Sequence, residues 1–286
     1  MGEFVQIHEV GPRDGLQNER HVIATGDKIR LVDMLSRCGL RKIEVTSFVR
    51  ADRVPQMADA AEVMAGISRR PGTHYTVLTP NMTGYQAALA AKADEVAVFA
   101  SASEGFSRQN INCSVRESLE RFAPLLVQAA ADGVPVRGYV SCVVDCPYDG
   151  PTEPEAVAEL SARLLGLGCF EISLGDTLGR GTPDRVAAML DAVLERVPAS
   201  FLAGHFHDTD GRALENIAVA LDRGLRVFDS AAGGLGGCPF APGAAGNVAT
   251  GKVVERLSAL GFDTRIDADG LVEAEDFALR LRGRCG

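Results

Sequence analysis

Eight short apolar or β-branched segments recur along the chain, and amphipathic stretches separate them. The segments span residues 4–10, 42–48, 74–79, 95–100, 134–141, 169–174, 201–207 and 227–231. Strands that alternate with helices are typical of βαβ units, whose strands pair in parallel. Eight such units in 286 residues fit one closed barrel, a fold that takes roughly 250 residues. The pattern therefore predicts an α/β protein with a single (β/α)8 TIM barrel domain over residues 1–286. A doubly wound open sheet is the alternative that spacing alone leaves open.

Several of the intervening stretches have helical periodicity, among them residues 114–131 and 154–167. Before the stretch 184–197, Thr182 and Pro183 indicate an N-cap followed by proline at the first helical position. A further helix, Ala268–Leu281, falls in an additional C-terminal segment that runs from about residue 265 to residue 286. We expect this helix to pack on the outside of the barrel or against a partner.

The chain is acidic, with a formal net charge of −9, which argues against nucleic acid as its main partner. No apolar run reaches the roughly 18 residues that a transmembrane helix needs, so no membrane partner is expected. The first residues lead almost at once into a predicted strand, without the pattern of a signal or transit peptide. We therefore expect a cytoplasmic protein.

The seven cysteines do not suggest a disulfide framework, because their number is odd and the chain is large. Cys142 and Cys146 are close in sequence, but no second Cys or His pair stands nearby to complete a zinc site. We expect most of these thiols to be buried core residues, with Cys238 as the exception.

Polar and charged residues gather at one end of nearly every predicted strand. Barrel enzymes place their chemistry at the carboxyl ends of the strands, so this end is the expected site. The residues there that are best suited to catalysis or metal binding are Arg13, Asp14, Glu44, Asp176, His205, His207, Cys238 and Asn247.

His205 and His207 are the most informative pair. Side chains two residues apart on a strand point the same way, so both imidazoles can enter the barrel mouth and bind one metal ion. Asp14 would add a carboxylate oxygen, and Asn247 could add an amide oxygen. Two imidazoles and two oxygens suit Mg²⁺ or Mn²⁺, while Zn²⁺ stays possible. Asp14 could instead be a turn residue before Gly15. From the pattern alone Asn247 is better interpreted as the N-cap of a helix over 248–257.

Arg13 and Cys238 are candidates for proton and charge handling. Arg13 is next to Asp14 in a predicted loop, where both side chains can turn inward and the guanidinium can stabilise a developing negative charge. An ion pair of Arg13 with Glu44 or Asp176 is a compatible structural role. Cys238 lies in the glycine-rich stretch 233–243, which suggests a mobile lid carrying a thiol that can exchange a proton. A plain structural thiol is the alternative.

Two long motifs resemble signatures of the 3-hydroxy-3-methylglutaryl-CoA (HMG-CoA) lyase family: residues 11–19, GPRDGLQNE, and residues 234–250, GLGGCPFAPGAAGNVAT. Shorter segments resemble the family in order, and the similarity covers about residues 4 to 282. These segments are 43–48, 77–81, 110–113, 137–142, 171–177 and 205–209. Two positions depart from the family pattern, because Asp210 stands where Tyr is often found and Gly251 where Glu is common.

The resemblance implies the (β/α)8 fold and assigns roles to the candidate residues. It makes Asn247 a metal ligand rather than an N-cap. The implied metal ligands, for Mg²⁺ or Mn²⁺, are Asp14, His205, His207 and Asn247. The implied catalytic and supporting residues are Arg13, Cys238, Glu44, Asp176 and His205.

The implied reaction is a metal-assisted retro-Claisen cleavage of HMG-CoA into acetyl-CoA and acetoacetate, as in leucine degradation. Asp14 or His205 would take the hydroxyl proton, Arg13 would stabilise the enolate, and Cys238 would protonate it. A related lyase for 3-hydroxy-3-isohexenylglutaryl-CoA or citramalyl-CoA, or an isopropylmalate-synthase-like enzyme, is one alternative. A non-catalytic metal- or CoA-binding protein is another. The resemblance also implies a bacterial-type member that forms a homodimer or a higher homo-oligomer.

Overall fold

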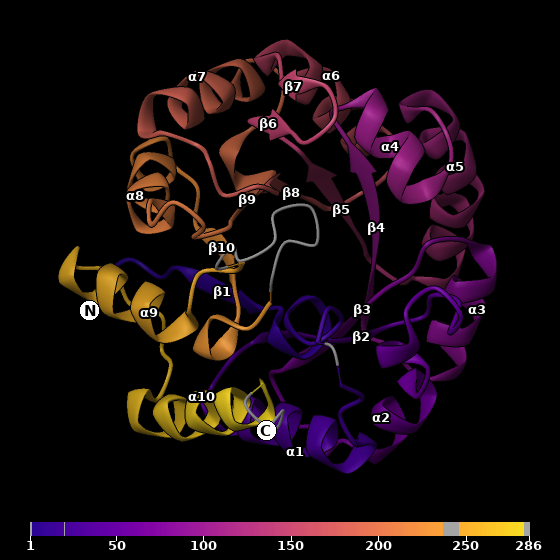
Figure 1. Ribbon diagram of the computed structural model, residues 1–286, viewed down its shortest axis with the longest axis vertical. Coiled ribbons are helices and arrows are strands. Elements are labelled where there is room, and N and C mark those ends of the chain that lie inside the picture. Colours follow the sequence, from indigo (N-terminus) through magenta and orange to yellow (C-terminus); the bar gives the residue numbers. More distant parts are fainter. Residues whose placement is uncertain (1, 20, 237–245, 283–286) are drawn as a thin grey trace.

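The computed structural model describes residues 2–19, 21–236 and 246–282. Within this part of the chain, eight parallel strands close into a barrel in the order β1-β10-β9-β8-β5-β4-β3-β2 (Figure 1). The barrel strands are β1 Gln6–Glu9, β2 Lys42–Ser47, β3 His74–Leu78, β4 Glu95–Ser101, β5 Val136–Ser141, β8 Glu171–Asp176, β9 Leu202–Phe206 and β10 Val227–Ser230. Each lies within or next to a predicted segment. The closed order confirms the barrel and excludes the open sheet.

Helices form an outer ring around the strands (Figure 1). They are α1 Thr25–Arg37, α2 Ala60–Gly66, α3 Met82–Ala90, α4 Glu104–Ile111, α5 Val115–Asp132, α6 Pro154–Gly166, α7 Pro183–Leu194, α8 Ala213–Asp222, α9 Thr250–Ala259 and α10 Ala268–Arg282. The short antiparallel pair β6 Asp145–Cys146 and β7 Gly150–Pro151 lies outside the barrel sheet. None of the described helices combines the length and apolar character that crossing a bilayer would need.

Local sequence signals account for several helix ends. Ser114 and Glu117 form a reciprocal capping box at the start of α5. The side chain of Thr182 accepts a hydrogen bond from Arg185 N, and Pro183 opens α7, which confirms the predicted cap. The predicted cap at Asn247 is wrong, because α9 begins at Thr250 with Ala249 at the N-cap. Asn247 instead pairs with His207 in an isolated antiparallel bridge.

Charged side chains fill part of the barrel interior, which branched apolar residues usually fill. Arg137 Nε donates to Glu171 at 2.7 Å, and Arg137 Nη1 and Nη2 donate to Asp229 at 2.9 and 2.7 Å. Each of these three residues is at most 6% exposed, so the ion pairs are buried. Breaking such a pair leaves a buried charge and costs about 3–5 kcal/mol. These three residues therefore form a buried polar network that links β5, β8 and β10 inside the barrel.

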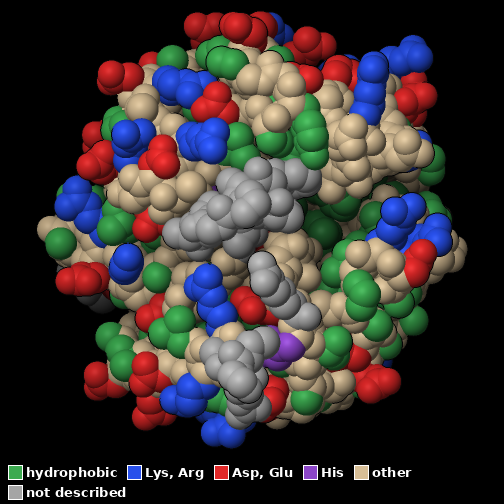
Figure 2. Space-filling view, in the orientation of Figure 1, with side chains coloured by type: hydrophobic (Ala, Val, Ile, Leu, Met, Phe, Trp, Pro, Cys, Tyr) green, Lys and Arg blue, Asp and Glu red, His purple; other side chains and the backbone are tan. Residues whose placement is uncertain are grey.

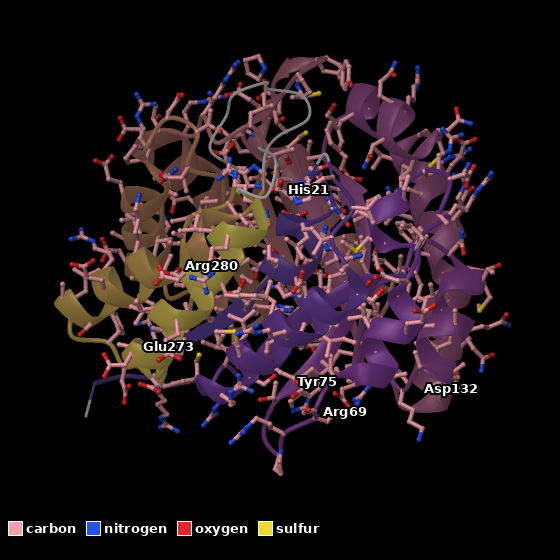
Figure 3. All side chains as sticks on the ribbon, turned by 60° about the horizontal axis from the view of Figure 1, so that its bottom comes forward. His21, Arg69, Tyr75, Asp132, Glu273 and Arg280 are labelled. Atoms are coloured by element: carbon pink, nitrogen blue, oxygen red, sulfur yellow. The ribbon has the colours of Figure 1, made fainter. Side chains whose placement is uncertain are left out.

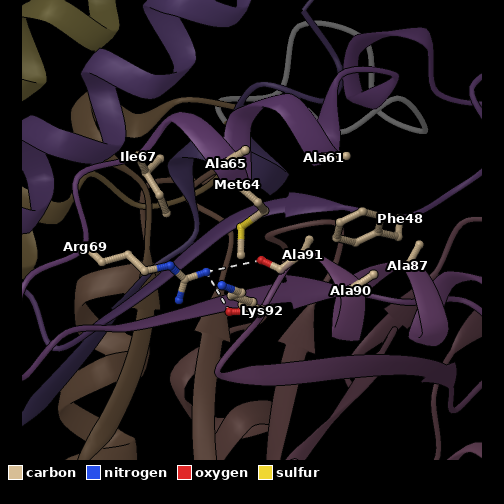
Figure 4. A pocket seen from close by; sticks show the side chains of 10 residues that line it. All are labelled: Phe48, Ala61, Met64, Ala65, Ile67, Arg69, Ala87, Ala90, Ala91 and Lys92. Atoms are coloured by element: carbon tan, nitrogen blue, oxygen red, sulfur yellow. Dashed lines mark hydrogen bonds between the residues drawn. The ribbon is translucent and has the colours of Figure 1, made fainter.

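An apolar cleft of about 720 Å³ lies outside the barrel, between α2 and α3 (Figure 4). Alanines line much of it, and Arg69 closes one end by donating from Nη2 to the carbonyl oxygens of Ala91 and Lys92 at 3.3 and 2.6 Å. None of the predicted site residues lines this cleft. The predicted site residues that the structure describes lie instead on the barrel strands or in the loops that follow their carboxyl ends.

Candidate active site

A single π-helical turn, Gly11–Gly15, follows β1 and presents Arg13 and Asp14 together. The N–H groups of Arg13, Asp14 and Gly15 all point to the carbonyl oxygen of Val10, at 3.2, 2.8 and 3.2 Å. A Cβ atom at Gly11 would lie 2.5 Å from Glu9 Oε1, and one at Gly15 would lie 2.7 Å from Leu235 Cβ. Any larger residue would force a neighbouring side chain to shift, which favours glycine at both ends of the turn. The segment predicted as a loop is thus a tight π-helical turn.

Arg13 is 6% exposed and is held by two carboxylates. Its Nε donates to Glu44 Oε2 at 2.6 Å, and its Nη1 donates to Asp14 Oδ1 at 2.6 Å. Burial opposes the charge on Arg13, but Glu44 and Asp14 raise its pKa above the ordinary value. The guanidinium is therefore a fixed positive charge at the mouth. The predicted ion pair forms with Glu44.

Three of the four predicted metal ligands form one cluster of possible metal-binding atoms. Asp14, His205 and His207 each offer a ligand atom, and these atoms lie within 4.8 Å of one another. His205 Nε2 and His207 Nε2 are 3.2 Å apart. Two ligands about 2.1 Å from one ion and at a right angle lie roughly 3 Å apart, so this spacing fits one divalent cation.

The protonation states of the cluster also fit metal binding. Burial would raise the pKa of Asp14, but the charges of Arg13 and the two histidines lower it to about 2. Burial and the neighbouring His205 lower the pKa of His207 to about 4. An ionised carboxylate and a neutral imidazole are the forms that bind metals. Both are favoured here at neutral pH.

Asn247 lies near residue 246, where the described part of the chain resumes, and its side chain reaches the cluster. Its Nδ2 donates to Asp14 Oδ2 at 2.7 Å and to the carbonyl oxygen of Leu235 at 3.3 Å. Backbone pairing with His207 holds the segment beside β9. The structure therefore brings Asn247 together with the other three predicted ligands.

Asp176 stands apart from this arrangement. The carboxylate of Asp176 accepts hydrogen bonds from Gly179 N at 3.1 Å and Gly181 N at 2.7 Å, so it shapes the loop after β8. Burial raises its pKa, and these backbone bonds oppose the shift. Cys238 lies outside the described residues. The five described cysteines are buried and free, as predicted for them: Cys38, Cys113, Cys142, Cys146 and Cys169.

Sequence reasoning missed Asp229, which supports the cluster from β10. His205 Nδ1 lies 3.1 Å from Asp229 Oδ2, which also accepts from Ser173 Oγ at 2.8 Å. Burial would raise the pKa of Asp229, but Arg137 holds it far below the usual range. The ionised carboxylate thus fixes the proton of His205 on Nδ1 and leaves Nε2 for a ligand. The sequence does contain a signal for this residue, because Asp229 is an acid within the otherwise mostly apolar strand segment 227–231.

Tyr139 on β5 was also missed. Its ring packs edge-on to His205 with 6.1 Å between ring centroids, and Arg13 lies 5.6 Å from its centroid. Its hydroxyl is buried, and none of the described residues forms a hydrogen bond with it. Buried hydroxyls are normally paired, so this one is suited to contact a bound molecule. Burial raises the pKa of Tyr139 well above its usual value, which keeps the phenol protonated.

Known proteins resemble this chain in both sequence and fold. The HMGL-like family model matches residues 4–278. The cytoplasmic 3-hydroxy-3-methylglutaryl-CoA lyase of Mus musculus is 54% identical over 277 residues, which cover 97% of this chain and 81% of that protein. The crystal structure of the HMG-CoA lyase from Brucella melitensis has 61% identity and a TM-score of 0.97, covering 98% of this chain and 99% of that one. An HMG-CoA lyase from Acinetobacter baumannii, solved in complex with coenzyme A and 3-methylmalate, has 36% identity and a TM-score of 0.93, covering 98% and 92%. The chain belongs to the HMG-CoA lyase family.

Proposed function

We propose that this chain is a lyase that cleaves HMG-CoA into acetyl-CoA and acetoacetate, with residues 1–286 as one catalytic domain. The observation that carries the proposal is the juxtaposition of a charge-clamped Arg13 with the Asp14, His205 and His207 cluster. Identity of about half over nearly the whole chain to HMG-CoA lyases supports the substrate assignment. The reaction implies a role in leucine degradation or ketone-body-type metabolism.

Asp14, His205, His207 and Asn247 would hold a divalent cation, for which we propose Mg²⁺ or Mn²⁺ because the set contains no thiolate and mixes imidazole with oxygen donors. When bound, such an ion lowers the pKa of a substrate hydroxyl and orients its oxygens. The second contacts of Asp14 to Arg13 and of His205 to Asp229 support this assignment, since ordered second contacts preserve ligand geometry.

The chain's own groups then divide the chemistry. Asp14 or His205 accepts the tertiary hydroxyl proton, and the hydroxyl oxygen becomes the ketone oxygen of acetoacetate. The electron pair of the broken carbon–carbon bond moves into the thioester as an enolate. Arg13, fixed by Glu44, stabilises the charge on the enolate oxygen. We assign protonation of the enolate carbon to Cys238, which the family motif supports.

The acyl-CoA partner follows from the same relatives, one of which was solved with coenzyme A. Basic and acidic side chains are interspersed over the face drawn in Figure 2, so the described residues there do not form one basic field. Recognition of an anionic CoA therefore depends on local contacts. We propose a cytoplasmic homodimer or higher homo-oligomer, in keeping with the cytoplasmic relative.

The direct test is acetyl-CoA formation from HMG-CoA, with Mg²⁺ or Mn²⁺ against a chelator. We expect rapid cleavage that stops when the chelator is added and returns with metal. The same assay is run with 3-hydroxy-3-isohexenylglutaryl-CoA and citramalyl-CoA. If metal binds but only one of these is cleaved, the site stands and the substrate assignment is wrong.

A further inference from the structure

The C-terminal helix α10 packs against both α1 and α9 and reaches the 3-10 turn Ala232–Gly234. Figure 3 brings α10 forward, with Glu273 and Arg280 labelled on it and His21 near its C-terminal end. His21 Nε2 lies 2.8 Å from the carbonyl oxygen of Leu281. The α10 helix is thus attached to the loop after β1 as well as to the outer ring.

Two short segments, which we call the feet, flank the residues that the structure does not describe. The first foot is 231–235 and the second foot is 246–251. Glu275 on α10 joins them, because its Oε1 accepts hydrogen bonds from Gly233 N at 3.0 Å and from Gly251 N at 2.8 Å. One carboxylate oxygen therefore fixes the spacing between the two feet.

Glu9 holds the same feet from the barrel wall, one residue earlier on each. Its Oε1 accepts from Ala232 N at 2.8 Å, and its Oε2 accepts from Thr250 Oγ1 at 2.6 Å. The feet also bond to each other, since Ala231 N donates to Val248 O at 3.0 Å. The two carboxylates thus clamp the feet from opposite sides, Glu9 from the barrel wall and Glu275 from α10.

Glycines at both Glu275 contacts leave room for the α10 side chains that pack there. A Cβ atom at Gly251 would lie 2.5 Å from Glu275 Oε2, and one at Gly233 would lie 2.9 Å from Leu279 Cγ. Gly233 also has φ of +63°, which favours glycine. Gly251 therefore leaves room for a carboxylate that arrives from α10.

The feet position groups at the metal cluster. The second foot carries Asn247, whose Nδ2 donates to Asp14 Oδ2 and to Leu235 O at the end of the first foot. A change in the spacing between the feet would move Asn247 relative to Asp14. We propose that Glu275 is a positioning residue for the divalent-metal site, through which α10 sets the placement of Asn247.

The test is Mn²⁺ binding without substrate, measured by calorimetry and by the EPR signal of free Mn²⁺. We expect Glu275→Ala to raise the Mn²⁺ dissociation constant roughly 10- to 100-fold, as loss of an outer contact typically does. Glu275→Gln keeps an oxygen acceptor for both N–H groups, so its affinity should lie near that of the unaltered protein. Glu273→Ala, on the exposed side of the same helix, is the matched control and should change nothing.

Gly251→Ala tests the same contact without altering the acid, because the new methyl group must displace Glu275. As a single substitution it should weaken Mn²⁺ binding, but it should add little further loss when combined with Glu275→Ala. Unchanged Mn²⁺ affinity in folded Glu275→Ala protein, or equal loss in Glu275→Gln, would overturn the proposal. If Glu275→Ala does not fold, Glu275→Gln and Gly251→Ala decide. The inference shares only the metal site with the proposed function. If the unaltered protein binds Mn²⁺ but has no lyase activity, the proposed function is wrong and the role of Glu275 is unaffected.

Discussion

Asp229 Oδ2 on β10 lies 3.1 Å from Nδ1 of His205 on the adjacent strand β9, so a carboxylate orients a predicted metal ligand from behind. The same carboxylate takes two hydrogen bonds from Arg137, which holds it ionised and in place. A carboxylate–histidine pair of this kind fixes both the tautomer and the ring orientation of a metal-binding imidazole. Hydrogen bonds therefore connect the buried Arg137 network to the candidate metal site.

Replacing Asp229 with Asn should weaken metal binding roughly 10- to 100-fold, because the amide no longer stabilises the Nδ1–H form of His205. It should also lower stability by about 3–5 kcal/mol, since Arg137 loses one of its buried partners. Mn²⁺ titration and chemical denaturation measure the two effects. Asp191→Asn is the control, because Asp191 forms a comparable pair with Arg223 in an exposed position. Unaltered Mn²⁺ affinity in Asp229→Asn would contradict the orienting role.

Replacing His207 with Ala should abolish tight metal binding and, with it, turnover. The reason is that His207 Nε2 faces His205 Nε2 at 3.2 Å and supplies one of few ligand atoms. Mn²⁺ titration and acetyl-CoA formation check both consequences. His74→Ala is the matched control, since the His74 side chain is 56% exposed and pairs with Glu95. Full metal affinity in His207→Ala would remove His207 from the ligand set.

Cys238→Ala should separate chemistry from binding. We expect it to lose most turnover while Mn²⁺ affinity stays at the level of the unaltered protein, because a thiol that protonates the enolate carbon is not a metal ligand. Steady-state kinetics and Mn²⁺ titration on the same preparation compare the two. Equal loss of metal would refute the assigned role, and undiminished turnover would do so as well.

Arg13→Lys should lower kcat roughly 100- to 1000-fold with a smaller effect on Mn²⁺ affinity. A lysine keeps the charge but not the planar fork that meets Glu44 and Asp14 together. Steady-state kinetics on HMG-CoA measure the change. Arg223→Lys, at an exposed pair with Asp191, should leave kcat unaltered. A normal kcat in Arg13→Lys would show that charge alone suffices.

The barrel and most residues of the candidate site could be predicted from the sequence because both depend on local pattern. The apolar segments specify strands, and the i, i+2 spacing of His205 and His207 places both imidazoles on one face. Asn247 shows the limit of such reasoning. Its local pattern is that of an N-cap, but pairing with His207 moves the helix start to Thr250.

The supporting residues depend on contacts between distant parts of the chain, which local pattern does not encode. Asp229 gains its role from His205 and Arg137, each on another strand. Glu275 gains its role only when α10 returns to Gly233 and Gly251. Tyr139 is marked by a buried hydroxyl that has no hydrogen-bond partner within the described part of the chain, which only the packed structure shows.

Glu9 should give the metal-free protein a measurable pH dependence of stability. Burial raises its pKa from 4.5 to about 7, although hydrogen bonds from Thr250, Ala232 and Gly11 oppose the shift. The folded state therefore binds more protons than the unfolded state between pH 4.5 and about 7, so this contribution to stability falls as pH rises through that window. Above about pH 7 the ionised Glu9 carboxylate lowers the free energy of unfolding by its full amount, at most about 3 kcal/mol.

Glu9→Gln removes this titration while keeping an oxygen for the two backbone N–H groups. We expect the variant to gain stability relative to the unaltered protein as pH rises from 5 to about 8, as measured by denaturation in the presence of a chelator. His207, with its pKa lowered to about 4, contributes the opposite slope below about pH 6.5, but equally in both proteins. The difference between the two therefore reports Glu9. Glu255→Gln on exposed α9 should show no such trend, and a stability difference that is constant with pH would mean that Glu9 does not titrate in this range.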